Sequence, residues 1–213
     1  MFADYASCFN VVPLSLDHEP EVCIDMLKEI DSGNKSTPAL VWAAKSVRDG
    51  NSAGLELAKF LVEKGADVNA VASGIDGDEC TLLRLAARAV LEGKAGGLEL
   101  ATLLVENGAD VDAVGKLDGD ECTPLWMVAR AVRDGRAGGL ELAKLLVERG
   151  AKVNAVGRGR DGDECTPLCL AARALGSAGG PELARLLLSA GAQLTESEKD
   201  ELQGVIDAAG VGG

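Results

Sequence analysis

The sequence predicts an all-α fold in which pairs of helices stack into a solenoid, and three observations predict it. An apolar segment that ends at Gly recurs four times, and a second apolar segment precedes each copy. Only 3% of the 213 residues are aromatic while 47% are hydrophobic, so Leu, Val and Ala must build the core. A core of this kind favours helices, and repeated helix pairs need neighbouring pairs to cover their apolar faces.

The segment that begins each pair starts at Thr or Ser. Its copies are STPALVWAAKSV (36–47), TLLRLAARAV (81–90), TPLWMVARAV (123–132) and TPLCLAARAL (166–175). Thr is a preferred N-cap residue, and in the two copies that open TPL Pro follows it directly, where the fixed φ of Pro suits the first helical turn. We therefore expect a helix that starts at each Thr and packs closely through its small Ala pair.

The second segment of each pair has a similar form in every copy. Its apolar stretch ends at a Gly, and a short sequence follows that Gly. Its copies are SAGLELAKFLVEKGADVNAV (52–71), AGGLELATLLVENGADVDAV (95–114), AGGLELAKLLVERGAKVNAV (137–156) and AGGPELARLLLSAGAQL (178–194). The glycines Gly65, Gly108, Gly150 and Gly191 lie 43, 42 and 41 residues apart. Glu in the first turn suits the positive end of a helix, and Gly supplies a left-handed cap residue, so we expect each helix to end at its Gly.

Both ends of the chain have the pattern of capping helices, which an array needs because a terminal repeat has no neighbour on one side. The segment TESEKDELQGVIDAAG opens with Thr195 and Glu198 in capping-box spacing. We expect one domain over residues 1–213. It comprises an N-terminal capping helix and arm (1–35), about four helix-pair repeats (36–194), and a C-terminal capping helix and tail (195–213).

The two segments together resemble the ankyrin repeat. The resemblance rests on GADVNAV at 65–71 and TPLCLAA at 166–172. That family repeats about every 33 residues, and the extra residues here lie in the link between the helices, such as RDGRAGG at 133–139, and in the finger before Thr. The resemblance implies an α-solenoid of stacked helix-turn-helix repeats with extended finger loops, whose concave groove binds protein partners.

The chain departs from the family pattern at two positions of the repeat. The His that follows TPL in the family is replaced by Val41, Arg84, Trp126 and Cys169. The Gly that lies two residues before Thr is replaced by Glu79, Glu121 and Glu164. The second departure leaves the conformation of the finger open, whereas the helix pairs are expected throughout.

The hexapeptide DGDECT occurs in three fingers, at 76–81, 118–123 and 161–166. Because equivalent positions of stacked helix pairs repeat at about 8–10 Å, the carboxylates of the three copies are expected to form a ladder along one edge of the array. The candidate binding residues in this ladder are Asp78, Glu79, Asp120, Glu121, Asp163 and Glu164.

Three interpretations of this ladder remain open. Asp and Gly can close a turn while Glu stays solvated. Alternatively, the stacked negative charges dock a protein partner with a basic surface. The third interpretation is calcium, which takes several oxygen ligands, although D-G-D-E lacks the spacing of an EF-hand loop.

A row of cations follows the Ala pair of the first helix, which is Val128-Ala129 in the third repeat. Its members are Lys45, Arg88, Arg130 and Arg173. By resemblance these four residues belong to the recognition surface of the concave groove, and the alternative is that they pair with the acidic ladder inside the molecule. Trp126 lies on the same helix; it either packs inside the array or acts as a binding anchor, a role in which Trp is enriched.

Three of the six cysteines, Cys80, Cys122 and Cys165, take the fifth position of the hexapeptide and therefore form one column. A disulfide requires Cα atoms within about 7 Å, less than the expected spacing of the repeats, so we expect reduced thiols in a cytoplasmic, reducing environment. Zinc would need two ligands besides Cys165 and Cys169. No metal site and no cofactor are expected.

Composition argues against several functions. With 34 acidic and 21 basic residues the formal charge is −13, which repels the phosphates of nucleic acid. No apolar run reaches the length of a membrane span, so membrane insertion is not expected. One His and no nucleophile beside a base indicate that the chain is not an enzyme. The sequence favours a protein–protein interaction module or scaffold; the alternatives are a calcium-binding protein and an accessory subunit of a larger complex.

Overall fold

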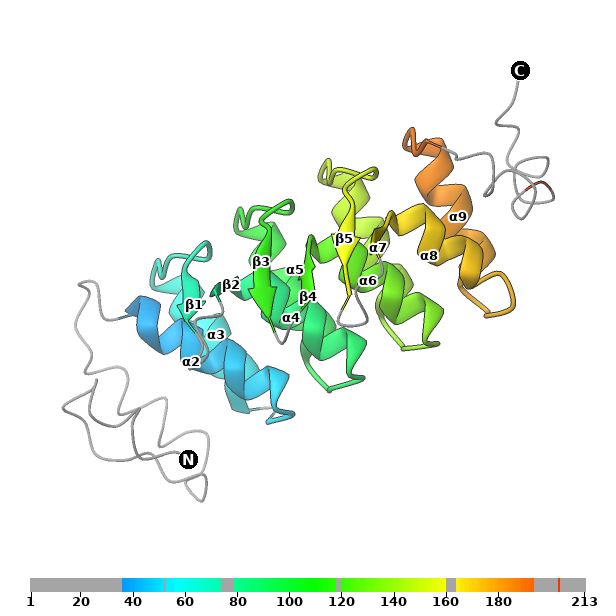
Figure 1. Ribbon diagram of the computed structural model, residues 1–213. Helices are drawn as coiled ribbons and strands as arrows, with labels where there is room; N and C mark the ends of the chain where they lie inside the picture. The colour runs from blue at the N-terminus through cyan, green and yellow to red at the C-terminus, as the bar shows by residue number, and fades with distance from the viewer. Residues whose placement is uncertain are drawn as a thin grey trace.

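The computed structural model describes residues 36–51, 53–73, 79–117, 120–159, 164–193 and Gln203. Within these residues four helix pairs stack in one row, which confirms the predicted α-solenoid (Figure 1). The first helices of the pairs are α2 (Ser36–Arg48), α4 (Leu82–Leu91), α6 (Pro124–Arg133) and α8 (Pro167–Arg173). The second helices are α3 (Ala53–Glu63), α5 (Gly97–Glu106), α7 (Gly139–Glu148) and α9 (Gly180–Ser189).

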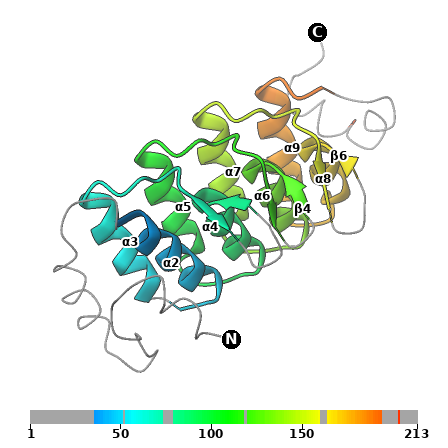
Figure 2. The same ribbon diagram turned by 60° about the vertical axis from the view of Figure 1, so that its left-hand side comes forward.

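The helices form two layers. The first helices of the pairs pack on one another in the order α2, α4, α6, α8 and make one layer, here called the inner helices. The second helices, here called the outer helices, pack in the order α3, α5, α7, α9 and make the other layer (Figure 2). Each repeat therefore contacts mainly its neighbours, as expected of a solenoid.

The inner helices begin where the sequence predicts. The side-chain oxygens of Thr81, Thr123 and Thr166 accept hydrogen bonds from backbone N–H groups three residues later, at 3.4, 3.3 and 3.1 Å. Pro124 and Pro167 occupy the first helical position. Each Thr satisfies one of the backbone donors that the first turn leaves without an intrahelical acceptor.

The outer helices end at their glycines. Gly108 has a φ of 87° and donates to the carbonyl of Val105, while the N–H of Ala109 reaches back to Leu104 at 3.0 Å. This is the geometry of a left-handed C-cap, which Gly adopts without steric cost. The other three repeats have the same left-handed glycine, at Gly65, Gly150 and Gly191.

Leu and Ala fill the core that runs through the array. Ala86, Ala87 and Leu104 are fully buried. Where an outer helix starts, glycine lets it approach the end of its inner helix: a Cβ added at Gly97 would lie 2.9 Å from Cβ of Ala89. The Gly in the first turn of each outer helix, at Gly54, Gly97, Gly139 and Gly180, therefore serves close packing.

The fingers are β-hairpins. Strands β1 (Val71–Ser73) and β2 (Glu79–Thr81) pair antiparallel. Strands β3 (Gly115–Leu117), β4 (Asp120–Cys122), β5 (Gly157–Arg158) and β6 (Glu164–Cys165) form one four-stranded antiparallel sheet. The sequence predicted extended finger loops and left their conformation open, so these strands are an addition to the predicted fold.

Several predicted features lie outside the described residues. They are the N-terminal cap and arm (1–35), most of the C-terminal cap and tail (195–213), and the finger positions Asp76, Asp78, Asp118, Asp161 and Asp163. In the part of the chain that the structure describes, no helix is long and apolar enough to cross a membrane.

Candidate functional site

Each finger hairpin has a buried face and an exposed face. In the first hairpin Ala72 pairs with Cys80, and both are buried, at 3% and 2% exposure. Val71 and Glu79 point to the opposite face because side chains alternate along a strand, and both are exposed. The exposed faces of the fingers are therefore available to a partner, whereas the buried faces hold the repeats together.

A column of exposed valines runs along the fingers. Val71, Val114 and Val156 are the last residues of the NAV or DAV triplet in successive repeats, and they are 53%, 61% and 59% exposed. They are the exposed large hydrophobic residues of the described chain. The sequence analysis did not single them out, although their recurrence beside the finger was a signal that could have found them.

A hollow of about 370 Å³ separates the first two fingers. Its walls include Val71 and Val114 from the valine column and Glu79 and Glu121 from the acidic ladder. The hollow thus combines apolar surface with two carboxylates, which suits a side chain with an aliphatic stem and a cationic end.

The glutamates of the predicted ladder are exposed on alternate strands, with Glu79 on β2, Glu121 on β4 and Glu164 on β6. Arg158 lies opposite Glu121 in the sheet and forms an ion pair with Glu164. The hydrogen bonds that Arg158 donates to Glu164, together with the negative charges of Glu164 and Glu121, raise the pKa of Arg158. The ladder therefore includes a cation of its own, which the sequence analysis missed.

Of the predicted aspartates, Asp120 lies in β4, and Asp78 and Asp163 are outside the described residues.

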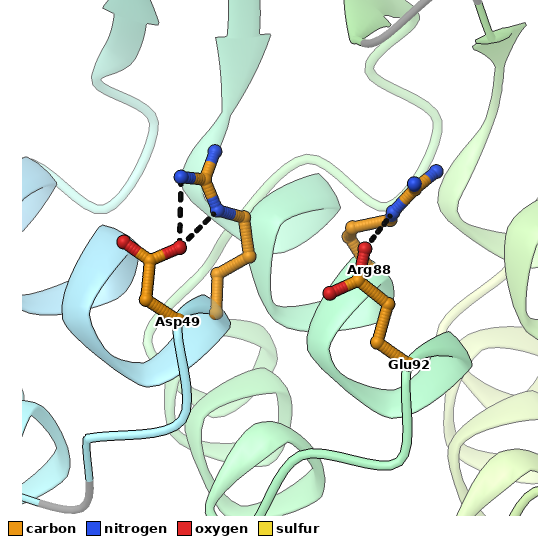
Figure 3. A network of polar contacts seen from close by, with 4 residues as sticks. Asp49, Arg88 and Glu92 are labelled. Atoms are coloured by element: carbon orange, nitrogen blue, oxygen red, sulfur yellow. Dashed lines mark hydrogen bonds and ion pairs between the residues drawn. The ribbon is translucent and has the colours of Figure 1, made fainter.

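The four cations of the inner helices differ in their surroundings. Arg88 is 7% exposed, and its Nε donates to Glu92 at 2.6 Å, four residues along the same helix (Figure 3). Lys45 and Arg130 are half-buried, and Arg173 is exposed. Arg88 thus contacts a carboxylate at the C-terminal end of its own helix. The acidic ladder, which was the alternative partner of the four cations inside the molecule, lies at the opposite end of that helix.

Arg88 and Arg130 line a second hollow, of about 350 Å³, at the end of the inner helices away from the fingers. Its other walls come from the ends of α4 and α6 and from the links that follow them: Leu91, Glu92, Lys94, Asp134 and Arg136. The structure therefore brings two predicted binding residues together with Lys94 and Arg136, which the sequence analysis did not identify.

Trp126 lies inside the array, at 3% exposure. Its ring Nε1 donates to the carbonyl of Cys165 in the next repeat at 3.0 Å, and Arg130 lies 6.0 Å from the ring centre. Of the two alternatives for Trp126, this burial supports packing inside the array, because a buried indole that bonds to a neighbouring finger holds two repeats together and presents no anchor on the surface.

Arg84 has the same role one repeat earlier. It is fully buried, and its Nη2 lies 3.6 Å from Sγ of Cys122 in the next finger. Cys80, Cys122 and Cys165 are buried free thiols, as the sequence predicts. Among the described residues no group of three or more His, Cys, Asp or Glu side chains is arranged to hold a metal ion.

Helix pairs stacked in one row, with hairpin fingers that carry the exposed residues, define the class of repeat scaffold. A family model of three ankyrin repeats matches residues 83–198, and a single ankyrin-repeat model matches residues 36–73. The chain belongs to the ankyrin-repeat family, whose repeats are generic modules of protein–protein interaction. A search of curated proteins gave no match.

Proposed function

We propose that the chain is a scaffold whose protein partner docks across the finger hairpins and the inner helices. The valine column, Val71, Val114 and Val156, is the observation that carries this proposal. Val71 and Val114 border one hollow and Val156 has the equivalent position in the next repeat, so the valines form a strip along the fingers. Exposed apolar patches of this kind mark interaction sites. The strip continues from repeat to repeat, so it suits an extended partner segment.

The chemistry of the strip favours a partner that is apolar and basic. Glu79 and Glu121 border the hollow between Val71 and Val114, and burial of those valines would remove apolar surface from water. Lys or Arg side chains satisfy both requirements, because their stems pack on apolar surface while their charged ends face carboxylates. Arg158, which lies opposite Glu121 and forms an ion pair with Glu164, shows the charged part of such a contact within the chain.

The proposal includes a non-enzymatic role and a cytoplasmic, reducing compartment. Three buried free cysteines, Cys80, Cys122 and Cys165, support the compartment because such thiols persist where the environment is reducing. The proposal also keeps the predicted capping helices within 1–35 and 195–213, so tests are designed on the full chain.

The first test replaces Val71, Val114 and Val156 together by Ser in the full chain. Wild type and variant are immobilised, exposed to lysate of the source cells, and the retained proteins are quantified by mass spectrometry. We expect the variant to lose the proteins that wild type retains, because most of each valine side chain is exposed and its removal takes away docking surface without creating a cavity.

The matched control replaces three exposed residues on the outer helices, Lys59→Ser, Glu106→Ser and Glu148→Ser. We expect this control to retain the same proteins as wild type, with circular dichroism showing that both variants are folded. Equal retention by the valine variant and the control would rule out the valine column as the docking surface.

A further inference from the structure

We propose that the hollow at the link end of the inner helices binds acidic side chains of the partner. This hollow, here called the basic hollow, is lined by Arg88, Leu91, Glu92, Lys94, Arg130, Asp134 and Arg136. The inference rests on the proposed function, because it assigns a second contact to the same docking event. It extends that function by stating the charge of the partner at each end of the groove.

Charge is the first observation. Four of the lining residues are cations and two are carboxylates, an excess of two positive charges. This excess occurs on a chain whose formal charge is −13. A local field opposite in sign to that of the molecule attracts acidic groups at one place and not elsewhere, which gives a docking site its specificity.

The two carboxylates of the basic hollow are already engaged by arginines. Glu92 accepts from Nε of Arg88 at 2.6 Å, and Asp134 accepts from Nε of Arg133 at 2.9 Å. Lys94 and Arg136 are exposed, and within the described residues neither forms an ion pair. Their charges are therefore available to an acidic group from outside the chain.

Lys94 and Arg136 also lie close to preceding links. The Cδ of Lys94 is 3.5 Å from the position that a Cβ on Gly50 would take, and Nη1 of Arg136 is 3.7 Å from the corresponding position on Gly93. Arg136 thus reaches back to the link that contains Lys94. Lys94 and Arg136 line the same hollow, and two cations at one site attract a carboxylate more strongly than either alone.

The fold itself does not require cations at these positions. In the first and last links the equivalent residues are Asn51 and Ser177, and both make local hydrogen bonds. Asn51 Oδ1 accepts from the N–H of Ala53 at 3.0 Å, and Ser177 Oγ donates to the carbonyl of Ala174 at 2.8 Å. The central two links use long cationic side chains where the outer two use short residues that close the turn.

The helix dipole does not account for the whole cluster. It favours cations in the last helical turn, where Arg88 and Arg130 lie. Lys94 and Arg136 each lie three residues beyond the last residue of α4 and α6. Arginine and lysine at the mouth of an open hollow suit carboxylates, which guanidinium groups bind in a bidentate manner.

The two charged regions lie at opposite ends of the inner helices. Helix α4 has 10 residues, which corresponds to about 15 Å between the finger end and the link end. A partner segment that crosses this distance would place basic side chains at the fingers and acidic side chains at the basic hollow. The arrangement therefore determines the orientation of the partner segment, with its basic side chains toward the fingers and its acidic side chains toward the basic hollow.

The test uses fluorescence anisotropy at low salt with a labelled ten-residue peptide that alternates Glu and Gly. The same peptide with Gln in place of Glu serves as the uncharged probe. We expect the full chain to bind the Glu peptide and not the Gln peptide. In Lys94→Gln with Arg136→Gln the affinity is expected to fall by about threefold to tenfold, the range for two exposed charge contacts.

The matched control is Lys59→Gln with Lys144→Gln, which removes two charges from the outer helices α3 and α7. We expect it to bind the Glu peptide as wild type does, because Lys59 and Lys144 do not line the basic hollow. Both variants change the net charge equally, so a difference between them does not come from net charge. The inference is overturned if the Glu peptide does not bind, or if the control loses as much affinity as the variant.

Two further arms separate the alternatives. A peptide with phosphoserine in place of Glu identifies phosphate as the preferred group if it alone binds, and that result overturns the carboxylate assignment. The valine variant is expected to bind the Glu peptide normally. If it also retains all the proteins that wild type captures, the proposed docking strip fails while the basic hollow stands.

Discussion

Arg84 and Trp126 occupy one position of consecutive repeats, and each packs against a glycine in the next finger. A Cβ on Gly115 would lie 2.7 Å from Nη1 of Arg84, and a Cβ on Gly157 would lie 2.6 Å from Cγ of Trp126. Any residue larger than Gly at 115 or 157 would therefore displace a buried side chain. The large side chain and the small residue are thus paired across the interface between repeats.

At this scale we predict that Gly157→Ala lowers the free energy of unfolding by about 1–3 kcal/mol, because the added methyl group overpacks against Trp126. Urea denaturation of wild type and variant measures the change.

Gly176→Ala is the control, since a Cβ at Gly176 meets no atom within 4 Å. We expect its effect to stay within about 0.5 kcal/mol. Similar losses in the two variants would show that glycine flexibility, and not contact with Trp126, causes the destabilisation.

Each inner helix is defined at both ends by residues nearby in sequence. Thr123 caps the start of α6, and the N–H groups of Asp134 and Gly135 bond to Arg130 and Val132 at its end. These local contacts explain why the helix boundaries could be predicted without knowledge of the fold. Packing between helices then stabilises elements that are short on their own.

We predict that Thr123→Ala lowers the free energy of unfolding by about 1 kcal/mol, because the N–H of Trp126 loses the oxygen that caps the helix. Thr123→Ser keeps an oxygen at the same place and is expected to retain most of the stability. Thermal melts of both variants distinguish the cap from packing of the Thr methyl group. If Ser and Ala cost the same, the methyl group is what matters.

The finger hairpins show what local patterns leave out. Their strands are two or three residues long, too short for an alternation of polar and apolar residues to be read from sequence. Glu79, Glu121 and Glu164 were predicted as site residues, but their position on the exposed face follows from strand register. Arg158 is a neighbour of Glu121 and Glu164 because β5 lies between β4 and β6 in the sheet, a pairing that the sequence does not reveal.

The whole chain carries a formal charge of −13 on 213 residues. Charge of one sign spread over a folded protein destabilises it through self-repulsion, and salt screens that repulsion. Exposed ion pairs such as Lys144–Glu182 act in the opposite direction, since salt weakens them.

We predict that the melting temperature of the full chain rises when sodium chloride is increased from low to physiological concentration. The physical reason is that repulsion among the excess carboxylates outweighs the few exposed pairs. Differential scanning calorimetry measures the shift, with an equal concentration of a neutral osmolyte as control. A fall in melting temperature would show that the surface ion pairs dominate.

The sequence by itself determined the helix pairs, their caps and the solenoid class. Thr123 and Gly108 act on backbone groups within five residues, so their roles follow from local chemistry. The same reasoning predicted the row of inner-helix cations, because equivalent positions of a repeat recur at fixed spacing.

Tertiary structure alone decided which of these residues are exposed. Trp126 is buried by a finger about 40 residues away in sequence, and Arg136 reaches back to Gly93 in the preceding link. Exposure and local charge are sums over such distant neighbours, so a pattern in one segment cannot give them. The exposed valine column and the basic hollow therefore emerge only from the stacking of one repeat on the next.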